Sequence, residues 1–505
     1  MAASLLGIDV GTTACKTVFT DLQGRVLAED STEYPLIHPE PSWVEQDPEA
    51  WWRAAASNIK AGLKKAGVRP EEVEGIGVDS QREAPVLLDR LGNVLYNAII
   101  WMDLRTIPTA EEIKKRTSAD KVLQITGVAV DYIFSAAKIL WLKEHKPKLV
   151  KKAQSILFPK DYLIYRLTGE KATDHSMASR TMLFDINRRS WSDEICIDLD
   201  IPMDLLPPVH ESVEKVGELT PEAGRLLGLK HGIPVAAGGG DRPVEALGAG
   251  VIDPGKVNIG TGTATAITTP LYSAKIDPLG RFNCCCHVVP GRWEYEIPIL
   301  TTGASLRWFR DNFGFEEVYR AKQERADPYQ YLDRLAQEAP LGCDGLFYYP
   351  YLSGPPGPRF NNLAKGVYFG FTTAHSKKHF VRAIFEGIAF QYAETLNLLD
   401  RFGVHISEAT IVGGESKSRF WNQMKADVIG RPIRSMKVAD AAALGSAVLG
   451  GVASGVFRSV KDAVKSMVHK RDCFLPDNRR TREYRNVLDR YNRVYECLEK
   501  GYSVG

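Results

Sequence analysis

Two turns rich in glycine and threonine, each between two predicted strands, have residue types that suit phosphate binding. The first is Gly11-Thr12-Thr13, just after an apolar run that ends in Asp9, and the second is Gly260-Thr261-Gly262-Thr263. Backbone N–H groups and hydroxyls in such turns suit phosphate oxygens, and the small side chains let a phosphate approach closely. One such turn is weak evidence, because many hairpins look alike. Two of them, about 250 residues apart, favour a nucleotide held between two related domains.

Polar residues follow two other predicted strands. Residues 75–79 form a short apolar strand that ends in a carboxylate, and Gln81-Arg82-Glu83 come directly after it. Residues 232–237 run apolar into three glycines, which are followed by Asp241 and Arg242. Taken alone, the glycines and Asp241 are typical of a turn with a helix N-cap. Taken alone, Arg82 and Glu83 are equally compatible with an ion pair at the surface.

The elements around these residues indicate an α/β chain with two domains. A three-strand meander is predicted over residues 5–28, and a helix is predicted from Asp47 and Pro48 to about Ala66. The second Gly/Thr turn has strand patterns on both sides in the same way. A chain of 505 residues is too long for one core, so we expect domains at 1–250 and 251–505.

Composition excludes several classes of protein. The chain has 64 Lys and Arg against 62 Asp and Glu, a net charge of +2, which provides no broad basic field for a nucleic acid. No apolar stretch is long enough to span a bilayer, and the first residues do not resemble a signal peptide. The eight cysteines form no C-x-x-C pair, which favours reduced thiols in a cytoplasmic protein.

Five segments, in order along the chain, resemble the FGGY family of carbohydrate and polyol kinases. They are residues 7–13, residues 43–52, Ser135 with Lys138 and Trp141, residues 366–386, and residues 412–427. The resemblance covers almost the whole chain. It implies an α/β, two-domain fold of the actin-like and Hsp70-like ATPase type (ribonuclease H-like), with an interdomain cleft. The glycines and Pro254 within residues 241–256 are suited to a hinge, which fits a cleft that closes.

The resemblance also implies roles for the candidate residues, with ATP and Mg²⁺ as cofactors. Asp241 matches the general base, which takes the proton of a substrate hydroxyl as that hydroxyl attacks the γ-phosphate. Asp9 matches the residue that holds Mg²⁺ through water, as expected for a metal that uses few carboxylates. The expected ATP-binding residues are Gly11, Thr12, Thr13 and Lys16, followed by Gly260, Thr261, Gly262, Thr263, Gly303, Gly414 and Ser418.

The expected acceptor-binding residues are Gln81, Arg82, Glu83, Asp103, Arg105 and Arg242. Much of the chain resembles xylulokinases, but those kinases have Gln-Met-His-Gly where this chain has Gln81-Arg82-Glu83-Ala84. Gln-Arg-Glu is similar to glycerol kinases, in which Arg and Glu bind polyol hydroxyls, and kinases of the autoinducer-2 type also have an Arg-Glu pair there. Arg242 either neutralises Glu83 or binds a substrate carbonyl or carboxylate through two parallel hydrogen bonds.

The sequence therefore predicts a kinase that uses ATP and Mg²⁺ to phosphorylate a small sugar or polyol. We rank a ketopentose such as xylulose first, glycerol or a tetritol second, and another sugar derivative third. The competing classes are a non-catalytic ATPase on the actin-like fold and a nucleotide-gated sugar sensor, because fold alone does not fix function. A homodimer is a further expectation.

Overall fold

The computed structural model describes residues 3–352, 357, 359, 361–438 and 440–502, and the chain divides into two compact units. The first unit contains Met1–Ile252, Pro270–Tyr295 and Asp440–His469, and the second contains Asp253–Thr269, Glu296–Ala439 and Lys470–Gly505. Two later segments therefore belong to the N-terminal unit, which the sequence patterns did not indicate. The division at residue 250 stays a prediction.

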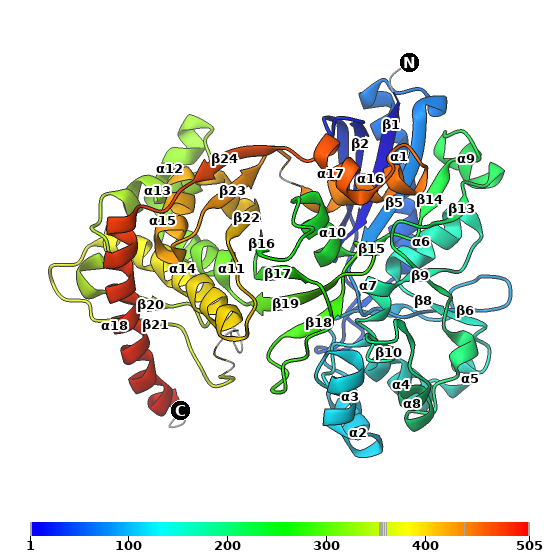
Figure 1. Ribbon diagram of the computed structural model, residues 1–505, viewed down its shortest axis with the longest axis horizontal. Helices are drawn as coiled ribbons and strands as arrows, with labels where there is room; N and C mark the ends of the chain where they lie inside the picture. The colour runs from blue at the N-terminus through cyan, green and yellow to red at the C-terminus, as the bar shows by residue number, and fades with distance from the viewer. Residues whose placement is uncertain (1–2, 353–356, 358, 360, 439, 503–505) are drawn as a thin grey trace. The chain divides into compact units, whose positions relative to one another are not determined.

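The main sheet of the first unit has the order β13-β14-β5-β1-β2-β3, and β15 pairs with β5 off this path (Figure 1). Its strands are β1 (Ser4–Val10), β2 (Ala14–Asp21), β3 (Val26–Glu33), β5 (Val73–Ser80), β13 (Lys215–Glu218), β14 (Pro234–Ala236) and β15 (Gly239–Gly240). The first three strands form the antiparallel meander that the sequence predicts. Parallel pairing places Asp79 opposite Asp9 and Gly239 opposite Asp79. The ends of β1, β5 and β15 therefore lie at one edge of the sheet.

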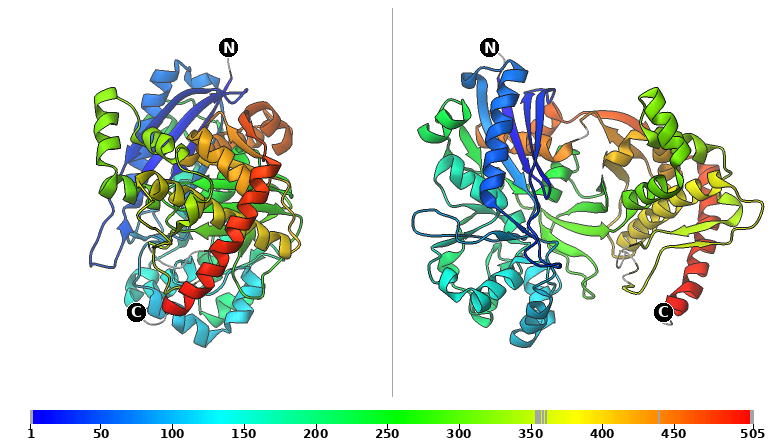
Figure 2. Two further views of the ribbon diagram at one scale, coloured as in Figure 1. Left: turned by 90° about the vertical axis from the view of Figure 1, so that its left-hand side faces the viewer. Right: turned by 180° about the vertical axis from the view of Figure 1, so that it is seen from behind.

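Helix α1 (Pro48–Ala66) packs along β2 and β3, as Figure 1 and the rear view in Figure 2 show. Asp47 caps its start by accepting a hydrogen bond from the Glu49 N–H, and Gly67, with φ of 63°, follows its last residue. Trp51 is fully buried on the side that faces the sheet. The predicted helix from Asp47 to about Ala66 is confirmed.

Helix α16 (Ala441–Ala453) packs on β1 and β5 at a distance that only glycine permits. A Cβ at Gly7 would lie 2.1 Å from the Ala443 carbonyl oxygen, and one at Gly77 would lie 1.8 Å from that of Ser446. These contacts hold the returning segment Asp440–His469 against the strands that carry Asp9 and Asp79.

A second apolar cluster of the first unit includes Phe134, Trp141 and Leu183. The helices of this unit are α2 (Ile107–Arg116), α3 (Ala119–Thr126), α4 (Ser135–His145), α5 (Pro147–Val150), α6 (Pro159–Thr168), α7 (His175–Ala178), α8 (Asp193–Asp198), α9 (Pro221–Leu227), α10 (Asp241–Gly248) and α17 (Val460–Met467). Its short strands are β4 (Glu45–Gln46), β6 (Val86–Leu88), β7 (Ala98–Ile99), β8 (Ser155–Leu157), β9 (Thr173–Asp174), β10 (Phe184–Asp185), β11 (Ser190–Trp191), β12 (Val209–His210) and β18 (Asn283–Cys286).

In the second unit, the strands β17-β16-β22-β23-β24 are neighbours in this order. They are β16 (Lys256–Thr261), β17 (Thr265–Leu271), β22 (Glu408–Gly413), β23 (Ile433–Met436) and β24 (Lys470–Phe474). The helices are α11 (Thr302–Phe313), α12 (Phe315–Glu324), α13 (Pro328–Gln337), α14 (Lys377–Arg401), α15 (Arg419–Ile429) and α18 (Asn478–Tyr502), and further strands are β19 (Trp293–Ile299), β20 (Phe347–Tyr349) and β21 (Val367–Phe369). The predicted strand, turn and strand around residues 260–263 are confirmed, because β16 and β17 form an antiparallel pair.

The predicted α/β class is confirmed, since both units combine a sheet with helices. The charged C-terminal segment starts as β24, which pairs with β23, and is helical in α18. Within the described part of the chain, no helix is long and apolar enough to cross a membrane.

We expect Gly77→Ala to destabilise the first unit by about 3 kcal/mol, because the methyl group would overlap the Ser446 carbonyl. For a unit of this size, that loss lowers Tm by roughly 6 to 12 °C. Gly501→Ala is the control, since its Cβ would meet nothing within 4 Å and its Tm should match the wild type. Equal Tm values for all three proteins would contradict the close packing of α16.

Candidate active site

Three carboxylates lie at the sheet edge where β1, β5 and β15 end. Asp9 and Asp79 are the next-to-last residues of their strands, and Asp241 follows β15 as the first residue of α10. Asp9 and Asp79 are 9% and 0% exposed, whereas the side chain of Asp241 is 33% exposed. The parallel registers therefore bring the predicted metal residue and the predicted base to the same edge, together with a buried acid that the sequence analysis did not single out.

Negative charge accumulates around Asp9. Burial and the nearby Asp440 carboxylate raise the pKa of Asp9 to about 8, and burial and Asp9 raise the pKa of Asp79 well above its usual range. Ser446 Oγ donates a 2.6 Å hydrogen bond to Asp79 Oδ1, while Asp79 Oδ2 has no hydrogen-bond partner among the described residues. The described residues contain no group of three or more His, Cys, Asp or Glu side chains that could hold a metal directly. A hard cation held through water would favour the charged form of these buried carboxyls, so Asp9 and Asp79 fit the predicted Mg²⁺ in that way.

The first Gly/Thr turn is held from several directions. Gly11 N–H closes the turn on the Ala14 carbonyl at 3.0 Å, and Gln46 Nε2 donates to the Thr12 carbonyl at 2.5 Å. Trp101 Nε1 donates to Thr12 Oγ1 at 3.0 Å. These hydrogen bonds hold the turn that carries Thr12 and Thr13 in one conformation.

Lys16, which was predicted to face phosphates, forms a 2.6 Å ion pair with Asp440. Asp440 is the N-cap residue of α16 and belongs to the returning segment. The sequence analysis missed Asp440, because it lies 424 positions from its partner. Its role is to hold the Lys16 ammonium group beside the turn.

Arg82 lies against the predicted base. Its Nε is 3.0 Å from Asp241 Oδ1, and the Arg82 side chain is 5% exposed. Gly240 makes this approach possible, since a Cβ there would lie 2.5 Å from Arg82 Cδ. The same Asp241 oxygen accepts a 2.8 Å hydrogen bond from the Arg242 N–H. Both contacts go to Oδ1, so the described residues leave Asp241 Oδ2 without a partner.

Glu83 pairs with Arg180, and the two alternatives for Arg242 stay predictions. Arg180 Nε lies 2.6 Å from Glu83 Oε1, and both side chains are buried. Lys138 Nζ donates to the Glu83 carbonyl at 2.7 Å, which supports a backbone with φ of 65°. Arg242 has an ion pair one helical turn along, with Glu245 at 3.5 Å.

Arg180 is therefore a site residue that the sequence analysis missed. Its guanidinium carbon lies 4.8 Å from the centre of the Phe134 ring, so the cation is packed as well as paired. The one available signal was an arginine within the small and apolar stretch of residues 176–184.

Asp103 and Arg105 form an ion pair with each other, and their contact with an acceptor stays a prediction. Arg105 bonds Asp103 at 2.7 Å and Glu45 at 2.8 Å, and its guanidinium carbon lies 3.7 Å from the centre of the Trp43 ring. The side chains of Asp103 and Arg105 are 0% and 1% exposed. These paired and enclosed charges fix the loop that carries Trp101.

Gln81 connects the acceptor loop to the first phosphate turn. It is buried, and its Nε2 donates a 2.6 Å hydrogen bond to Gln46 Oε1. Gln46 in turn donates to the Thr12 carbonyl. Gln81 therefore has a positioning role whether or not it also contacts an acceptor.

The second unit brings the other predicted nucleotide residues together. Thr261 Oγ1 donates to the Val412 carbonyl at 2.6 Å, and a Cβ at Gly303 would lie 2.1 Å from the Gly262 carbonyl oxygen. A Cβ at Gly414 would meet nothing within 4 Å, which leaves open space beside the turn for a ligand. Ser418 caps α15 by accepting a hydrogen bond from the Trp421 N–H.

Glu415 is a buried carboxylate that joins both nucleotide segments of this unit. It lies 2.6 Å from Lys425 Nζ and accepts a hydrogen bond from the Tyr392 hydroxyl at 3.0 Å. The Glu415 N–H donates to Thr261 Oγ1 at 3.2 Å, and Thr265 Oγ1 lies 2.9 Å from the same Tyr392 hydroxyl. The sequence analysis named Glu415 within its motif but gave it no role.

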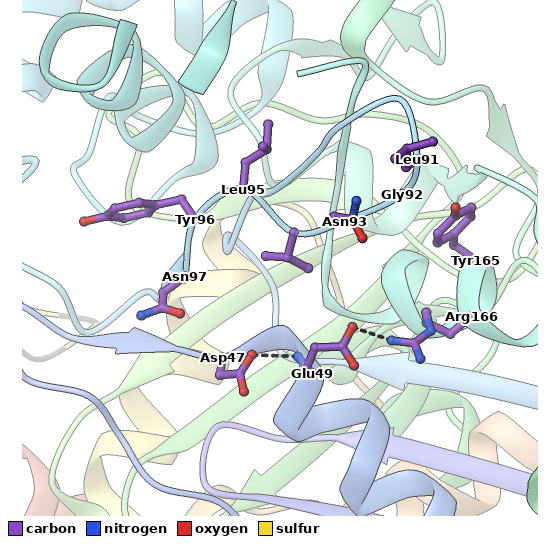
Figure 3. Close-up of a pocket in the computed structure, with 11 residues that line it drawn as sticks. Asp47, Glu49, Leu91, Gly92, Asn93, Leu95, Tyr96, Asn97, Tyr165 and Arg166 are labelled. Atoms are coloured by element: carbon purple, nitrogen blue, oxygen red, sulfur yellow. Dashed lines mark hydrogen bonds and ion pairs between the residues drawn. The ribbon is translucent and has the colours of Figure 1, made fainter. Parts of the chain in front are cut away.

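A separate polar hollow of about 600 Å³ lies beside the start of α1 (Figure 3). Its lining includes Asp47, Glu49, Asn93, Tyr96, Tyr165 and Arg166, and Figure 3 shows Arg166 directed toward Glu49. None of the predicted site residues lines it, so this hollow is not part of the candidate site.

Family comparison agrees with this geometry over most of the chain. The model of the N-terminal domain of the FGGY family of carbohydrate kinases matches residues 4–248, and that of the C-terminal domain matches residues 255–454.

Individual proteins of known name are similar over nearly the full length. A xylulose kinase of Bacillus subtilis is 33% identical over 97% of this chain and 96% of its own. A glycerol kinase of Thermococcus gammatolerans is 34% identical over 92% of this chain and 91% of its own. The crystal structure of a ligand-bound xylulose kinase from Lactobacillus acidophilus superposes with a TM-score of 0.89, at 26% identity and 99% coverage of both chains.

We expect Glu415→Ala to destabilise the second unit, since breaking a buried ion pair costs about 3 to 5 kcal/mol when one charge stays behind. The double variant Glu415→Ala with Lys425→Met should recover much of the lost Tm, because no buried charge remains unpaired. Thermal unfolding of the three proteins measures this. A single variant with wild-type Tm would contradict the description of this network.

Proposed function

We propose that Asp241 is the catalytic base of this protein. The chain belongs to the FGGY family of carbohydrate kinases, and this membership makes it an ATP-dependent sugar kinase. The observation that carries this proposal is the way in which Asp241 is held. Arg82 and the Arg242 N–H bind Oδ1, and Oδ2 is available to accept the proton of a substrate hydroxyl.

Phosphoryl transfer needs mainly positioning and neutralisation of charge. We assign Thr12, Thr13 and Lys16 to the outer phosphates of ATP. The second-unit residues Gly260 to Thr263, Gly303, Gly414 and Ser418 are assigned to the rest of the nucleotide. When bound, Mg²⁺ would offset charge on the phosphates, and Asp9 would hold it through water with Asp79 beside it.

The acceptor is proposed to be a small molecule with neighbouring hydroxyls. Glu83 resembles Asp241 in its pairing, since Oε1 binds Arg180 and the described residues leave Oε2 without a partner. A carboxylate oxygen of this kind can accept a hydrogen bond from a donor, and a hydroxyl of a sugar or polyol is such a donor. We rank a ketopentose first, in line with the similar xylulose kinases.

A triol or tetritol is the second candidate, and a specific observation favours it. The guanidinium of Arg82 reaches the base directly, so Arg82 and Asp241 can both contact a chain of only three or four carbons. A similar glycerol kinase is 34% identical to this chain. Mg²⁺, a homodimer and a cytoplasmic location stay predictions.

An acceptor screen tests the proposed substrate class. ADP release from ATP should rise by at least about two orders of magnitude with one ketopentose, triol or tetritol, since acceptor binding supplies the group that attacks. Aldoses and sugar acids are the comparison set. ATP turnover that no acceptor stimulates would contradict the proposal and favour a non-kinase ATPase, and acceptor binding without transfer would indicate a sensor.

The base assignment has its own test. Asp241→Asn should lower kcat about 10³-fold on the best acceptor, because the amide cannot take the proton, while affinity for an ATP analogue stays within about threefold. Asp204→Asn, an exposed position in the same unit, is the control. A variant that keeps a tenth of wild-type kcat would refute the assignment.

A further inference from the structure

The strand that delivers Asp241 is only two residues long, and its position depends on side chains from elsewhere in the first unit. β15 consists of Gly239 and Gly240, which have no side chains to anchor them. The Gly240 N–H, directly before the base, donates a 2.9 Å hydrogen bond to Ser176 Oγ. Ser176 lies in α7, which packs beside β15 (Figure 1).

Ser176 is itself fixed by Asp174. Asp174 Oδ2 accepts hydrogen bonds from Ser176 Oγ at 2.6 Å, from the Ser176 N–H at 2.9 Å and from Ser212 Oγ at 2.7 Å. Asp174 and Ser176 are 0% and 1% exposed. The hydroxyl proton of Ser176 is therefore committed to Asp174, and its oxygen is left to accept from Gly240.

Lys160 holds the other end of the same segment. Its side chain is fully buried, and Nζ bonds Asp161 at 2.5 Å, Asp174 at 3.1 Å and the Ala237 carbonyl at 2.8 Å. The Lys160 N–H also donates to Ser80 Oγ at 3.0 Å, and Ser80 directly precedes the acceptor loop. One residue thus bonds both the segment that leads to the base and the strand that leads to Gln81, Arg82 and Glu83.

A structural purpose alone does not explain this arrangement. A buried ion cluster is expensive, and apolar residues of similar volume usually stabilise a protein as well or better. Here the hydrogen bonds of the cluster involve the Ala237 carbonyl and the Gly240 N–H, which lie on either side of Gly238 and Gly239. Displacements of about 1 Å at a reacting group can cost about 10²-fold in rate.

We propose that Lys160, Asp174 and Ser176 are positioning residues for phosphoryl transfer, which set the place of Asp241 relative to the acceptor loop. This inference rests on the proposed role of Asp241 as base. None of the three residues contacts the reacting atoms. They act through the backbone at Ala237, Gly240 and Ser80.

The test compares two serines that bond the same carboxylate oxygen. Ser176→Ala removes one hydrogen bond to Asp174 and also the partner of the Gly240 N–H. Ser212→Ala removes one hydrogen bond to Asp174, and among the described residues its side chain bonds nothing else. Each change deletes a single oxygen, so both variants are expected to fold, and thermal unfolding checks that they do.

We expect Ser176→Ala to lower kcat on the best acceptor at least about tenfold, with KM for ATP within about threefold, because only the reacting geometry changes. Ser212→Ala should keep kcat within about twofold. Equal kcat values for the two variants, with equal Tm, would overturn the inference and leave the cluster a purely structural one.

Asp241→Asn separates this inference from the proposed function. If Asp241→Asn is inactive and the two serine variants have equal kcat, the positioning inference fails alone. If Asp241→Asn keeps a tenth of wild-type kcat, the base assignment fails, and the inference that rests on it fails with it. A large loss in both Asp241→Asn and Ser176→Ala, with Ser212→Ala unaffected, supports both.

Discussion

The concentration of carboxylates at one sheet edge is the constraint on which the rest of the first unit depends. Asp9, Asp79 and Asp241 are brought together by parallel pairing, and like charges in a buried place are unfavourable unless cations or hydrogen bonds offset them. Arg82 offsets Asp241, and Ser446 from the returning segment binds Asp79. The close packing of α16 on the glycines of β1 and β5 therefore brings Ser446 to Asp79, so it stabilises this carboxylate as well as the core.

Two guanidinium–carboxylate pairs give the candidate acceptor site its form. In each pair, Arg82 with Asp241 and Arg180 with Glu83, one carboxylate oxygen is bound and the other has no partner among the described residues. The bound oxygen fixes the orientation of the carboxylate, and the other oxygen keeps its capacity for a hydroxyl. Such preorganisation lowers the cost of orienting an acceptor, which is how this fold can position a small and flexible substrate.

Features that are local in sequence could be predicted, and features that join distant segments could not. The meander, the two Gly/Thr turns and α1 follow from short patterns of strands, turns and caps, and the structure confirms them. No local sequence pattern marks Arg180 or Asp440, because their partners in the site, Glu83 and Lys16, lie 97 and 424 positions away. Asp103 and Arg105 were singled out by their place in a family motif, but the motif did not show that their charges pair with each other inside the core.

The central claim is that Glu83 binds the acceptor from a position set by Arg180, and a double-mutant cycle on kcat/KM tests it most directly. Glu83→Gln, Arg180→Met and the double variant are measured on the best acceptor, with thermal unfolding as a check that each is folded. Residues that act as one pair give non-additive losses, so the account predicts a coupling energy of about 2 kcal/mol or more. Losses that add, with a coupling energy below about 0.5 kcal/mol, would contradict it.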